Sequence, residues 1–447
     1  MKKIIALALC LLMVFGMVAC GVQTEEETQN AIDAAQEKTL SENSGTGAAA
    51  LIAEGKKPYE GQTLVVWTSY ELGTDVQQVA DAWIARFAEV TGADIQVKHQ
   101  GRDLQTLLYP ALDAGEEIDV FSVGSTIQLG LQMDHGLDLT DYIANSDMAD
   151  RSYPVLMKQI RDVAEDGETY YAIPTLSSMN AWWYNQDIFD AAGITEVPET
   201  IEEFEAACDA IVAAGFYPIA ADTAYSTAYI GPLVGRMVGE SVVAELTHEG
   251  GFAENEDFVA ACQKIIDWRA KGYFEPDAPG VWPASQNRIG LMKDTAMVYT
   301  GSWVTAEVEA ACGETLNWGS FQFPVDPTSE NGTVGVSCSC TCNMIHKDCD
   351  TTDLAWDYIY FMSTGEANKA ITDVNNYLVD DRTMDPLPKF EGTQDAMEEA
   401  ADYVNGTGGL HDNIDIKTSV TEVCTNLLSG MYATGEEAAA AFDALLG

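Results

Sequence analysis

The chain has 447 residues, of which 71 are aspartate or glutamate and 22 are lysine or arginine, so its formal net charge at pH 7 is −49. A surface this acidic repels phosphates and anionic headgroups, which argues against nucleic acid, anionic membranes and a large acidic substrate as partners. The folded part, residues 58–447, is longer than chains that fold around a single hydrophobic core usually are, so two lobes are expected.

The first twenty residues have the plan of a secretory signal. Lys2 and Lys3 precede an apolar run, residues 4–19, which is short for a membrane span. The run ends in Met-Val-Ala-Cys-Gly, which resembles a bacterial lipobox, although Met17 is a less usual residue at its head. Cleavage before Cys20 would make this cysteine the first, lipid-bearing residue, with palmitate as a typical acyl chain. The alternative is an ordinary signal peptide that carries an accidental cysteine.

Residues 20–57 are predicted to be a lipidated cysteine followed by a flexible tether. The stretch is acidic, rich in alanine and poor in aromatic residues. Such a composition buries too little apolar surface to offset the entropy lost on ordering. The remaining chain has no further apolar run of transmembrane length, so the folded body is not expected to span a membrane.

Strands and helices alternate at the start of the folded part. Strands are expected at 63–67, 95–97 and 118–123, with helices over 74–91 and 104–114. Thr74 and Gln77 have the spacing of a capping box at the start of the first helix. This order is typical of parallel βαβ units, whose ligands bind at the loops that follow the strands. Here those loops are 67–73 and 124–128.

The segment 170–220 continues the pattern with clear helix starts. Asn185 can cap a short helix, and Thr200 with Glu203 forms a capping box for the next one. Further strands are expected at 217–221, 295–300, 321–325 and 335–343, followed by helices from 352 onward around a loop at 375–388.

Short motifs in a fixed order extend over residues 60–440. In chain order they are Trp67, Phe87, Thr91-Gly92, Ile118-Asp119-Val120, Gly136 to Thr140, Pro174, Tyr184-Asn185, Ala192-Gly193, Pro198-Glu199-Thr200, Glu203-Phe204, Pro218-Ile219-Ala220, Ala296-Met297, Gly301-Ser302-Trp303 and Phe323-Pro324. In this order, behind a lipobox, the chain resembles the extracellular solute-binding proteins of family 1. These are the substrate-capturing subunits of ATP-binding-cassette (ABC) importers, mostly for carbohydrates.

The resemblance implies an α/β, two-lobed fold like that of periplasmic binding proteins, with a ligand cleft between lobes joined by hinges. Crossings between the lobes are expected near 176–181, 336–341 and 386–391. Lobe 1 would contain 58–178 and about 340–388, and lobe 2 about 179–339 and 389–447.

Eight cysteines remain when Cys10 and Cys20 are set aside, and three of them form Ser-Cys-Ser-Cys-Thr-Cys. Cys338, Cys340 and Cys342 would all face one side of a strand, where three thiolates could bind a soft metal. The alternative is that small side chains fill a tight buried surface. The hinge position that the resemblance implies favours packing.

A neutral sugar has an apolar ring face and a fringe of hydroxyls, so its site needs aromatic side chains together with carboxylates, amides or arginine. Trp83, Trp268 and Trp356 lie on apolar helix faces and are expected in the core. The family commonly stacks sugar on an aromatic residue at the equivalent of Trp303. The expected ligand contacts are Trp67, Ser69, Glu71, Ser125, Thr126, Ser178, Trp183, Asp222, Tyr225, Tyr229, Trp282, Trp303 and Arg382. Whether Trp182 or Trp183 faces the cleft is open.

The sequence thus predicts a lipid-anchored, monomeric binding protein on the outer face of the bacterial cytoplasmic membrane. It would capture a carbohydrate, an oligosaccharide in the first instance, and deliver it to the permease subunits of an ABC importer, without cofactor, metal or catalysis. One alternative is the same fold carrying a non-sugar solute. Another is a secreted glycoside hydrolase, although no G-x-S-x-G or H-E-x-x-H motif is present.

Overall fold

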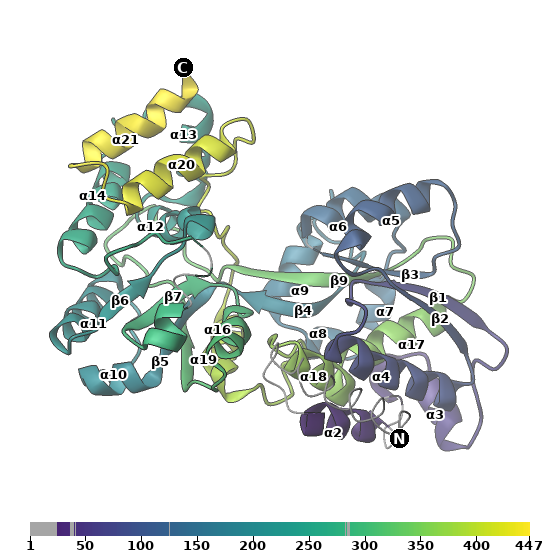
Figure 1. Ribbon diagram of the computed structural model, residues 1–447. Coiled ribbons are helices and arrows are strands. Elements are labelled where there is room, and N and C mark those ends of the chain that lie inside the picture. The colour runs from purple at the N-terminus through teal and green to yellow at the C-terminus, as the bar shows by residue number, and fades with distance from the viewer. Residues whose placement is uncertain (1–24, 36–39, 41, 125, 282, 284–286) are drawn as a thin grey trace, which may run out of the picture.

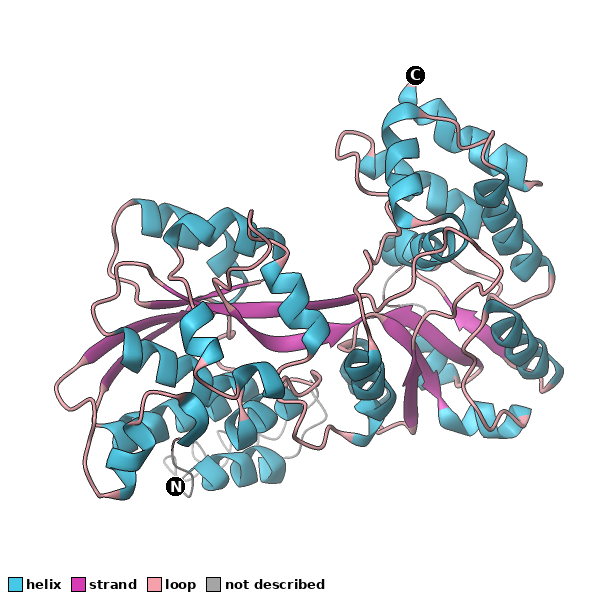
Figure 2. Cartoon of the chain, turned by 180° about the vertical axis from the view of Figure 1, so that it is seen from behind, coloured by secondary structure: helices cyan, strands magenta, loops and turns pink. Residues whose placement is uncertain are grey.

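Two β-sheets organise the chain, one in each of two lobes that lie side by side (Figures 1 and 2). The computed structural model describes residues 25–35, 40, 42–124, 126–281, 283 and 287–447. Helices cover both sheets, and two long strands, β4 and β9, run from one lobe towards the other. The predicted two-lobed α/β fold is confirmed.

The sheet of lobe 1 has the strand order β2-β1-β3-β9-β4. Strand β1 is parallel to β2 and β3, whereas β9 is antiparallel to both of its neighbours. The strands are β1 (Thr63–Thr68), β2 (Asp94–His99), β3 (Val120–Val123), β4 (Ile173–Met179) and β9 (Cys338–Ile345). The helices around them are α4 (Asp75–Thr91), α5 (Leu104–Asp113), α6 (Thr126–Gln132), α7 (Thr140–Ala144), α8 (Met148–Arg151), α9 (Pro154–Arg161), α17 (Thr352–Ser363) and α18 (Gly365–Val374).

The sheet of lobe 2 has the order β6-β7-β5-β8. Its strands are β5 (Ala181–Asn185), β6 (Tyr217–Ala220), β7 (Thr295–Thr300) and β8 (Trp318–Phe321). The surrounding helices are α10 (Gln186–Ala192), α11 (Ile201–Ala213), α12 (Ser226–Val238), α13 (Glu240–Glu249), α14 (Glu256–Ala270), α16 (Val304–Cys312), α19 (Glu391–Glu399), α20 (Lys417–Leu428) and α21 (Gly435–Asp443). None of the helices in the described part of the chain is both long and apolar enough to cross a bilayer.

The helix starts follow the local signals in the sequence. The Thr74 hydroxyl accepts the N–H of Gln77 at the start of α4, and Asn185 caps α10. Thr200 and Glu203 form the reciprocal capping box of α11. Each side chain satisfies an N–H group that has no partner within its helix. The caps at Asn185 and Thr200 are confirmed, whereas only half of the box predicted at α4 forms, because the Gln77 side chain accepts the N–H of Gly73 at 2.9 Å and not that of Thr74. The core position of Trp83, Trp268 and Trp356, which are at most 2 % exposed, is also confirmed.

The tether predicted for residues 20–57 is wrong for the residues of this stretch that the structure describes. Helices α2 (Glu25–Ala35) and α3 (Ala48–Ala53) lie on lobe 1 (Figure 1). The indole of Trp356 donates to the carbonyl of Ser44 at 2.8 Å, and the Thr46 hydroxyl donates to Asp357 at 2.7 Å. Alanines are buried here because their small side chains let the segment approach the helices closely. A low count of large apolar residues therefore did not mean disorder.

The alternate cysteines of β9 point to one side of the strand. Cys338, Cys340 and Cys342 are buried, and the Cys340 and Cys342 sulfur atoms lie 3.6 Å apart. Burial raises the pKa of the Cys338 thiol to about 12, which disfavours a thiolate. Within the described residues, no three His, Cys, Asp or Glu side chains are grouped so that they could hold a metal ion. This placement favours the packing interpretation.

Three connections join the sheets. Strand β4 belongs to lobe 1 and β5 to lobe 2, so the chain crosses between Met179 and Ala181. It returns between β8 and β9, and crosses again between α18 and α19. The first turn of α19 contains Gly392, which lies against the carbonyl of Ser320 in β8. The first and second connections are antiparallel neighbours along β4 and β9. Paired strands of this kind can bend together as a hinge.

Candidate functional site

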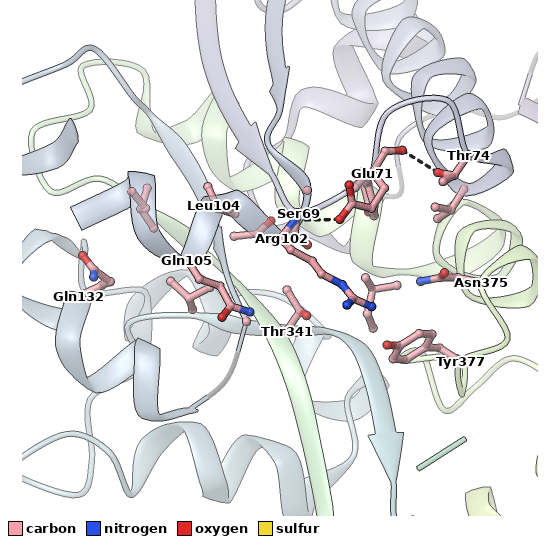
Figure 3. Close-up of a pocket in the computed structure, with 18 of the residues that line it drawn as sticks. Ser69, Glu71, Thr74, Arg102, Leu104, Gln105, Gln132, Thr341, Asn375 and Tyr377 are labelled. Atoms are coloured by element: carbon pink, nitrogen blue, oxygen red, sulfur yellow. Dashed lines mark hydrogen bonds between the residues drawn. The ribbon is translucent and has the colours of Figure 1, made fainter. Parts of the chain in front are cut away.

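A cavity of about 810 Å³ lies in lobe 1 at the carboxyl ends of β1 and β3 (Figure 3). Its wall is formed by the loop after β1 and the start of α4, the first turns of α5, the ends of β3 and α6, and the turn after α18. Leu176 of β4 and Thr341 of β9 complete it. This is the edge at which open α/β sheets bind ligands, and its volume is in the range of ligand pockets.

Ser69 and Glu71, two of the expected ligand contacts, line this cavity. One carboxylate oxygen of Glu71 accepts the backbone N–H of Arg102 at 3.0 Å, and the Thr74 hydroxyl donates to the Glu71 carbonyl at 2.7 Å (Figure 3). Gly101 has a φ of 57°, and the carboxylate lies only 2.3 Å from where a Cβ would be. Glycine is therefore needed both for the backbone conformation and for the close approach.

The aromatic residues of the cavity are tyrosines rather than tryptophans. Tyr70, Tyr109 and Tyr377 line it, and Tyr109 is 48 % exposed. Gln105 and Asn375 add amide groups. Sequence reasoning missed these residues because it considered the loops after the first and third strands but not the one after β2, and because it searched for tryptophan. The polar run Gln100–Arg102 directly after β2 was the available signal.

Trp67 and Trp183 do not line the cavity, which corrects the expectation for both. Trp67 is 4 % exposed in β1, with the Lys98 ammonium 4.7 Å from its ring. Trp183 is fully buried in β5, where its indole donates to the Thr300 carbonyl at 2.9 Å. Strand β5 is interior to its sheet, and both faces are covered: Trp182 packs against Phe204 and Trp183 against Phe390. Neither of the two adjacent tryptophans therefore faces a ligand in this conformation.

Two further expected contacts, Asp222 and Tyr229, also lie in the core of lobe 2. Asp222 is fully buried at the end of β6, and the Tyr229 hydroxyl donates to the Ala220 carbonyl at 2.7 Å. Burial raises the pKa of Tyr229, and the nearby charge of Asp222 adds to that rise. Both side chains therefore pack beneath the loop after β6 and are not exposed on its surface.

Tyr225 and Trp303 stay partly exposed on lobe 2 and lie close together. Burial raises the pKa of Tyr225, while a hydrogen bond with Trp303 opposes that rise. The Trp303 ring lies so close to Gly301 that a Cβ there would be 1.8 Å from it. Ser178, at the lobe 2 end of β4, has its hydroxyl 3.4 Å from that of Ser302. The expected contacts at 178, 225 and 303 are thus neighbouring parts of lobe 2 and the connecting strand.

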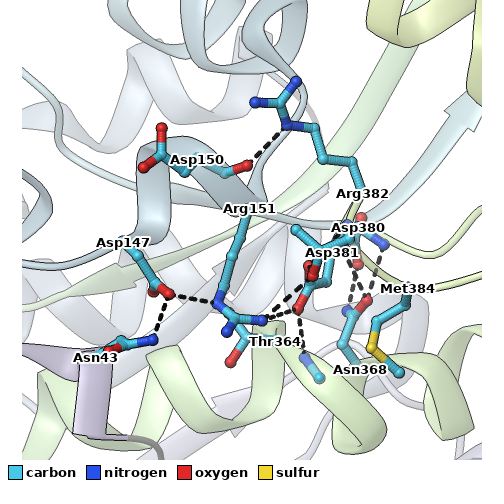
Figure 4. Close-up of polar contacts among 12 residues, drawn as sticks. Asn43, Asp147, Asp150, Arg151, Thr364, Asn368, Asp380, Asp381, Arg382 and Met384 are labelled. Atoms are coloured by element: carbon cyan, nitrogen blue, oxygen red, sulfur yellow. Dashed lines mark hydrogen bonds and ion pairs between the residues drawn. The ribbon is translucent and has the colours of Figure 1, made fainter.

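Arg382 lies outside the cavity, contrary to the expectation (Figure 4). Its Nε donates to the carbonyl of Asp150 at 2.8 Å. The preceding aspartates fix this turn: Asp381 pairs with Arg151 at 2.7 Å, and Asp380 accepts from the strand β4. Sequence reasoning selected the right segment but the wrong face of it, since the neighbouring Tyr377 is the residue that reaches the cavity.

Nothing is described for the side chains of three other expected ligand contacts, Ser125, Thr126 and Trp282, or of the expected lipidation site. Thr126 begins α6 at the cavity end of β3. Ser125, Trp282 and Cys20 lie outside the described residues.

Solved structures with the same architecture support the assignment of the fold. One is a family 1 extracellular solute-binding protein from Alicyclobacillus acidocaldarius, with 16% identity, a TM-score of 0.68, and 88% of this chain and 100% of that chain covered. A chitin oligosaccharide binding protein has 18% identity, a TM-score of 0.58 and coverages of 86% and 98%. The GacH receptor of Streptomyces glaucescens, solved unliganded and with acarbose, has 17% identity, a TM-score of 0.58 and coverages of 86% and 97%.

The sequence itself gives the family. No curated protein matches the chain. Residues 82–379, however, match the family model described as bacterial extracellular solute-binding protein. The match contains every strand of the two sheets except β1, together with the first two connections between the lobes. The chain therefore belongs to the bacterial extracellular solute-binding proteins.

Proposed function

We propose that this chain captures an oligosaccharide between its two lobes and delivers it to the permease of an ABC importer. Family membership supports a binding protein rather than an enzyme. Among the similar structures, one is named for chitin oligosaccharide and another was solved with acarbose. Both names favour a carbohydrate made of several sugar units.

The observation that carries the proposal is the mixture of groups in the lobe 1 cavity. Tyr109 and Tyr377 supply ring faces, while Glu71, Gln105 and Asn375 supply acceptors and donors around them. Sugar rings have apolar faces that pack on aromatic side chains, and their hydroxyls need hydrogen-bond partners once water is removed. A purely apolar or purely charged cavity would not serve such a ligand.

Lobe 2 would supply the opposing surface. The Trp303 indole lies over Gly301, with Tyr225 beside it, in a partly exposed position after β7. Closure about β4 and β9 would bring this aromatic pair towards the lobe 1 cavity. A ligand that touches both lobes binds the closed form more tightly and so shifts the equilibrium towards it. The permease would then recognise the closed form.

The lipid anchor belongs to the same proposal. Acylation of Cys20 would hold the protein at the outer face of the cytoplasmic membrane. Since α2 and α3 lie on lobe 1, the attachment would reach the protein through that lobe. Mass spectrometry of the mature N-terminus, with Cys20→Ser as the control, tests for the acyl chain.

A thermal-shift screen of the mature protein against monosaccharides and oligosaccharides tests the function. A ligand at about 100 times its Kd should stabilise the native state by roughly 2.7 kcal/mol. A shift with an oligosaccharide and none with its constituent monosaccharide is the expected result. If no sugar shifts the midpoint, or if the protein hydrolyses a bound glycoside, the proposal is wrong.

Gly101→Ala is expected to weaken sugar binding beyond its effect on stability. Alanine at a φ of 57° costs about 1 kcal/mol, and its Cβ would displace the Glu71 carboxylate. Gly115→Ala is a matched control, because Gly115 also has a positive φ, 73°, but a Cβ there meets nothing within 4 Å. Urea unfolding should show a loss for both variants, larger for Gly101→Ala because the displaced carboxylate also releases the Arg102 N–H, while calorimetry should show weaker binding only for Gly101→Ala. Equal affinities would remove Glu71 from the site.

A further inference from the structure

Arg102 is the cationic residue of the lobe 1 cavity. It lies in the turn between β2 and α5, and its side chain extends away from Glu71 towards Tyr377 and Asn375 (Figure 3). Its backbone N–H is held by the Glu71 carboxylate, which fixes where the side chain starts. Burial raises the pKa of Tyr377, and the positive charge of Arg102 opposes this rise, so the guanidinium lies near the Tyr377 hydroxyl.

The guanidinium of Arg102 makes no ion pair or hydrogen bond with any described residue, although acidic residues outnumber basic ones by 71 to 22 in this chain. Six of the seven other arginines hold the guanidinium against a carboxylate or a backbone carbonyl: Arg86, Arg151, Arg236, Arg269, Arg288 and Arg382. The seventh, Arg161, has a buried Nε without a partner among the described residues, but it does not line the cavity. A guanidinium is built to bind a planar carboxylate through two parallel hydrogen bonds. The guanidinium of Arg102 can therefore bind a carboxylate of a ligand in this way.

The rest of the cavity is compatible with a negative group on the ligand. Helices α4 and α5 both begin at its wall, and the positive end of a helix dipole favours negative charge. The two carboxylates there are each compensated locally: Glu71 accepts an N–H, and Asp75 lies in the first turn of α4. Gln132 is 6 % exposed, and its side-chain oxygen has no partner among the described residues, so it can accept a sugar hydroxyl.

We propose that the ligand is an acidic oligosaccharide whose carboxylate pairs with Arg102, as in a chain that contains uronic acid. This inference rests on the proposed function, and it narrows the substrate class. The net charge of −49 does not exclude such a ligand, because salt screens distant surface charges within about 8 Å at physiological ionic strength. A sugar phosphate is less suitable, since one arginine would face about two negative charges next to Glu71 and Asp75.

Calorimetry with uronic acid oligosaccharides and their methyl esters tests the inference, because the ester keeps the sugar skeleton and removes the charge. The free acid should bind the mature protein about 10- to 100-fold more tightly than the ester. Arg102→Gln should remove that preference, because it weakens binding of the acid much more than binding of the ester. Arg382→Gln, which alters an arginine outside the cavity, should keep the preference.

The possible failures are distinct. If esters or neutral oligosaccharides bind as tightly as the acids, or if Arg102→Gln weakens acid and ester equally, the carboxylate pairing is wrong and the proposed function stands. If neither acidic nor neutral sugars bind, the proposed function fails and the inference with it. Arg102 is exposed, so circular dichroism should show an unchanged fold in its variant.

Discussion

Replacement of Asp380 by alanine is expected to lower the free energy of unfolding by about 3–5 kcal/mol. The side chain is 2 % exposed and accepts from the backbone N–H groups of Leu176 at 2.9 Å and Ser177 at 2.7 Å. The Ser177 hydroxyl also donates to it, as does the Asn368 amide at 2.6 Å (Figure 4). Alanine leaves these donors buried without an acceptor, and each such group costs about 1–3 kcal/mol.

The same change should disturb the cavity. The pairing of β4 with β9 shifts register between Thr175 and Ser177, and Leu176 there has a φ of 50°, which is unusual for a residue with a side chain. Leu176 forms part of the cavity wall. Asp380 holds this irregular turn in place by binding its two N–H groups, so loss of the carboxylate frees the strand to straighten and withdraw Leu176.

Urea unfolding followed by circular dichroism measures the stability loss. Asp385→Ala is the control, because its side chain is exposed and its described contact is through the backbone carbonyl, which accepts from Lys369 at 2.7 Å. The free energy of unfolding of Asp380→Asn should lie between those of the wild type and Asp380→Ala, since the amide keeps one acceptor oxygen. If the free energy of unfolding of Asp380→Ala lies within about 1 kcal/mol of the wild-type value, the N–H groups of Leu176 and Ser177 must have other acceptors, and Asp380 does not hold this segment.

Local signals predicted the elements well because their causes are local. A capping box such as Thr200 with Glu203 acts over three residues, and the apolar stripe of a helix acts over a few turns, so both can be read from the sequence. Their combined order carried the resemblance that gave the two-lobed fold. The prediction of a tether was wrong because a segment of small residues can be ordered by the surface on which it packs. Here that surface includes Trp356 and Asp357 on α17, whose hydrogen-bond partners lie 312 and 311 residues earlier in the chain.

The site was less predictable because it depends on which face of an element meets the cavity. Trp183 lies on a strand whose two faces are both covered, by Phe204 on the Trp182 side and by Phe390 on its own, and nothing local distinguishes such a strand from one at a cleft. Arg102 and Tyr377 meet only because β2 and the turn after α18 are brought together across the sheet edge. Sequence reasoning identified the loop at 375–388 but did not consider the one after β2, and no local signal shows that the two segments lie together.

Trp303→Ala is expected to weaken oligosaccharide binding by about 2–3 kcal/mol, which is roughly 30- to 150-fold in Kd. The indole is partly exposed, lies close to Gly301 and is hydrogen-bonded with Tyr225, so removing it takes away a rigid ring surface without opening a core cavity. Trp303→Phe keeps a ring and should lose less. Calorimetry with the sugar identified in the screen gives the affinities, and urea unfolding should give midpoints close to that of the wild type.

Trp183→Ala provides the contrast that separates a ligand surface from the core. This fully buried indole packs on Phe390 and bonds to the Thr300 carbonyl, so its loss should cost about 3–5 kcal/mol of stability. Below its unfolding transition the Trp183 variant should still bind, because the side chain touches neither the cavity of lobe 1 nor the exposed surface around Trp303. The reverse result, with normal affinity for Trp303→Ala and lost affinity for a folded Trp183→Ala, would require a closed form in which β5 is exposed and would overturn the placement of the lobe 2 ligand surface at Trp303.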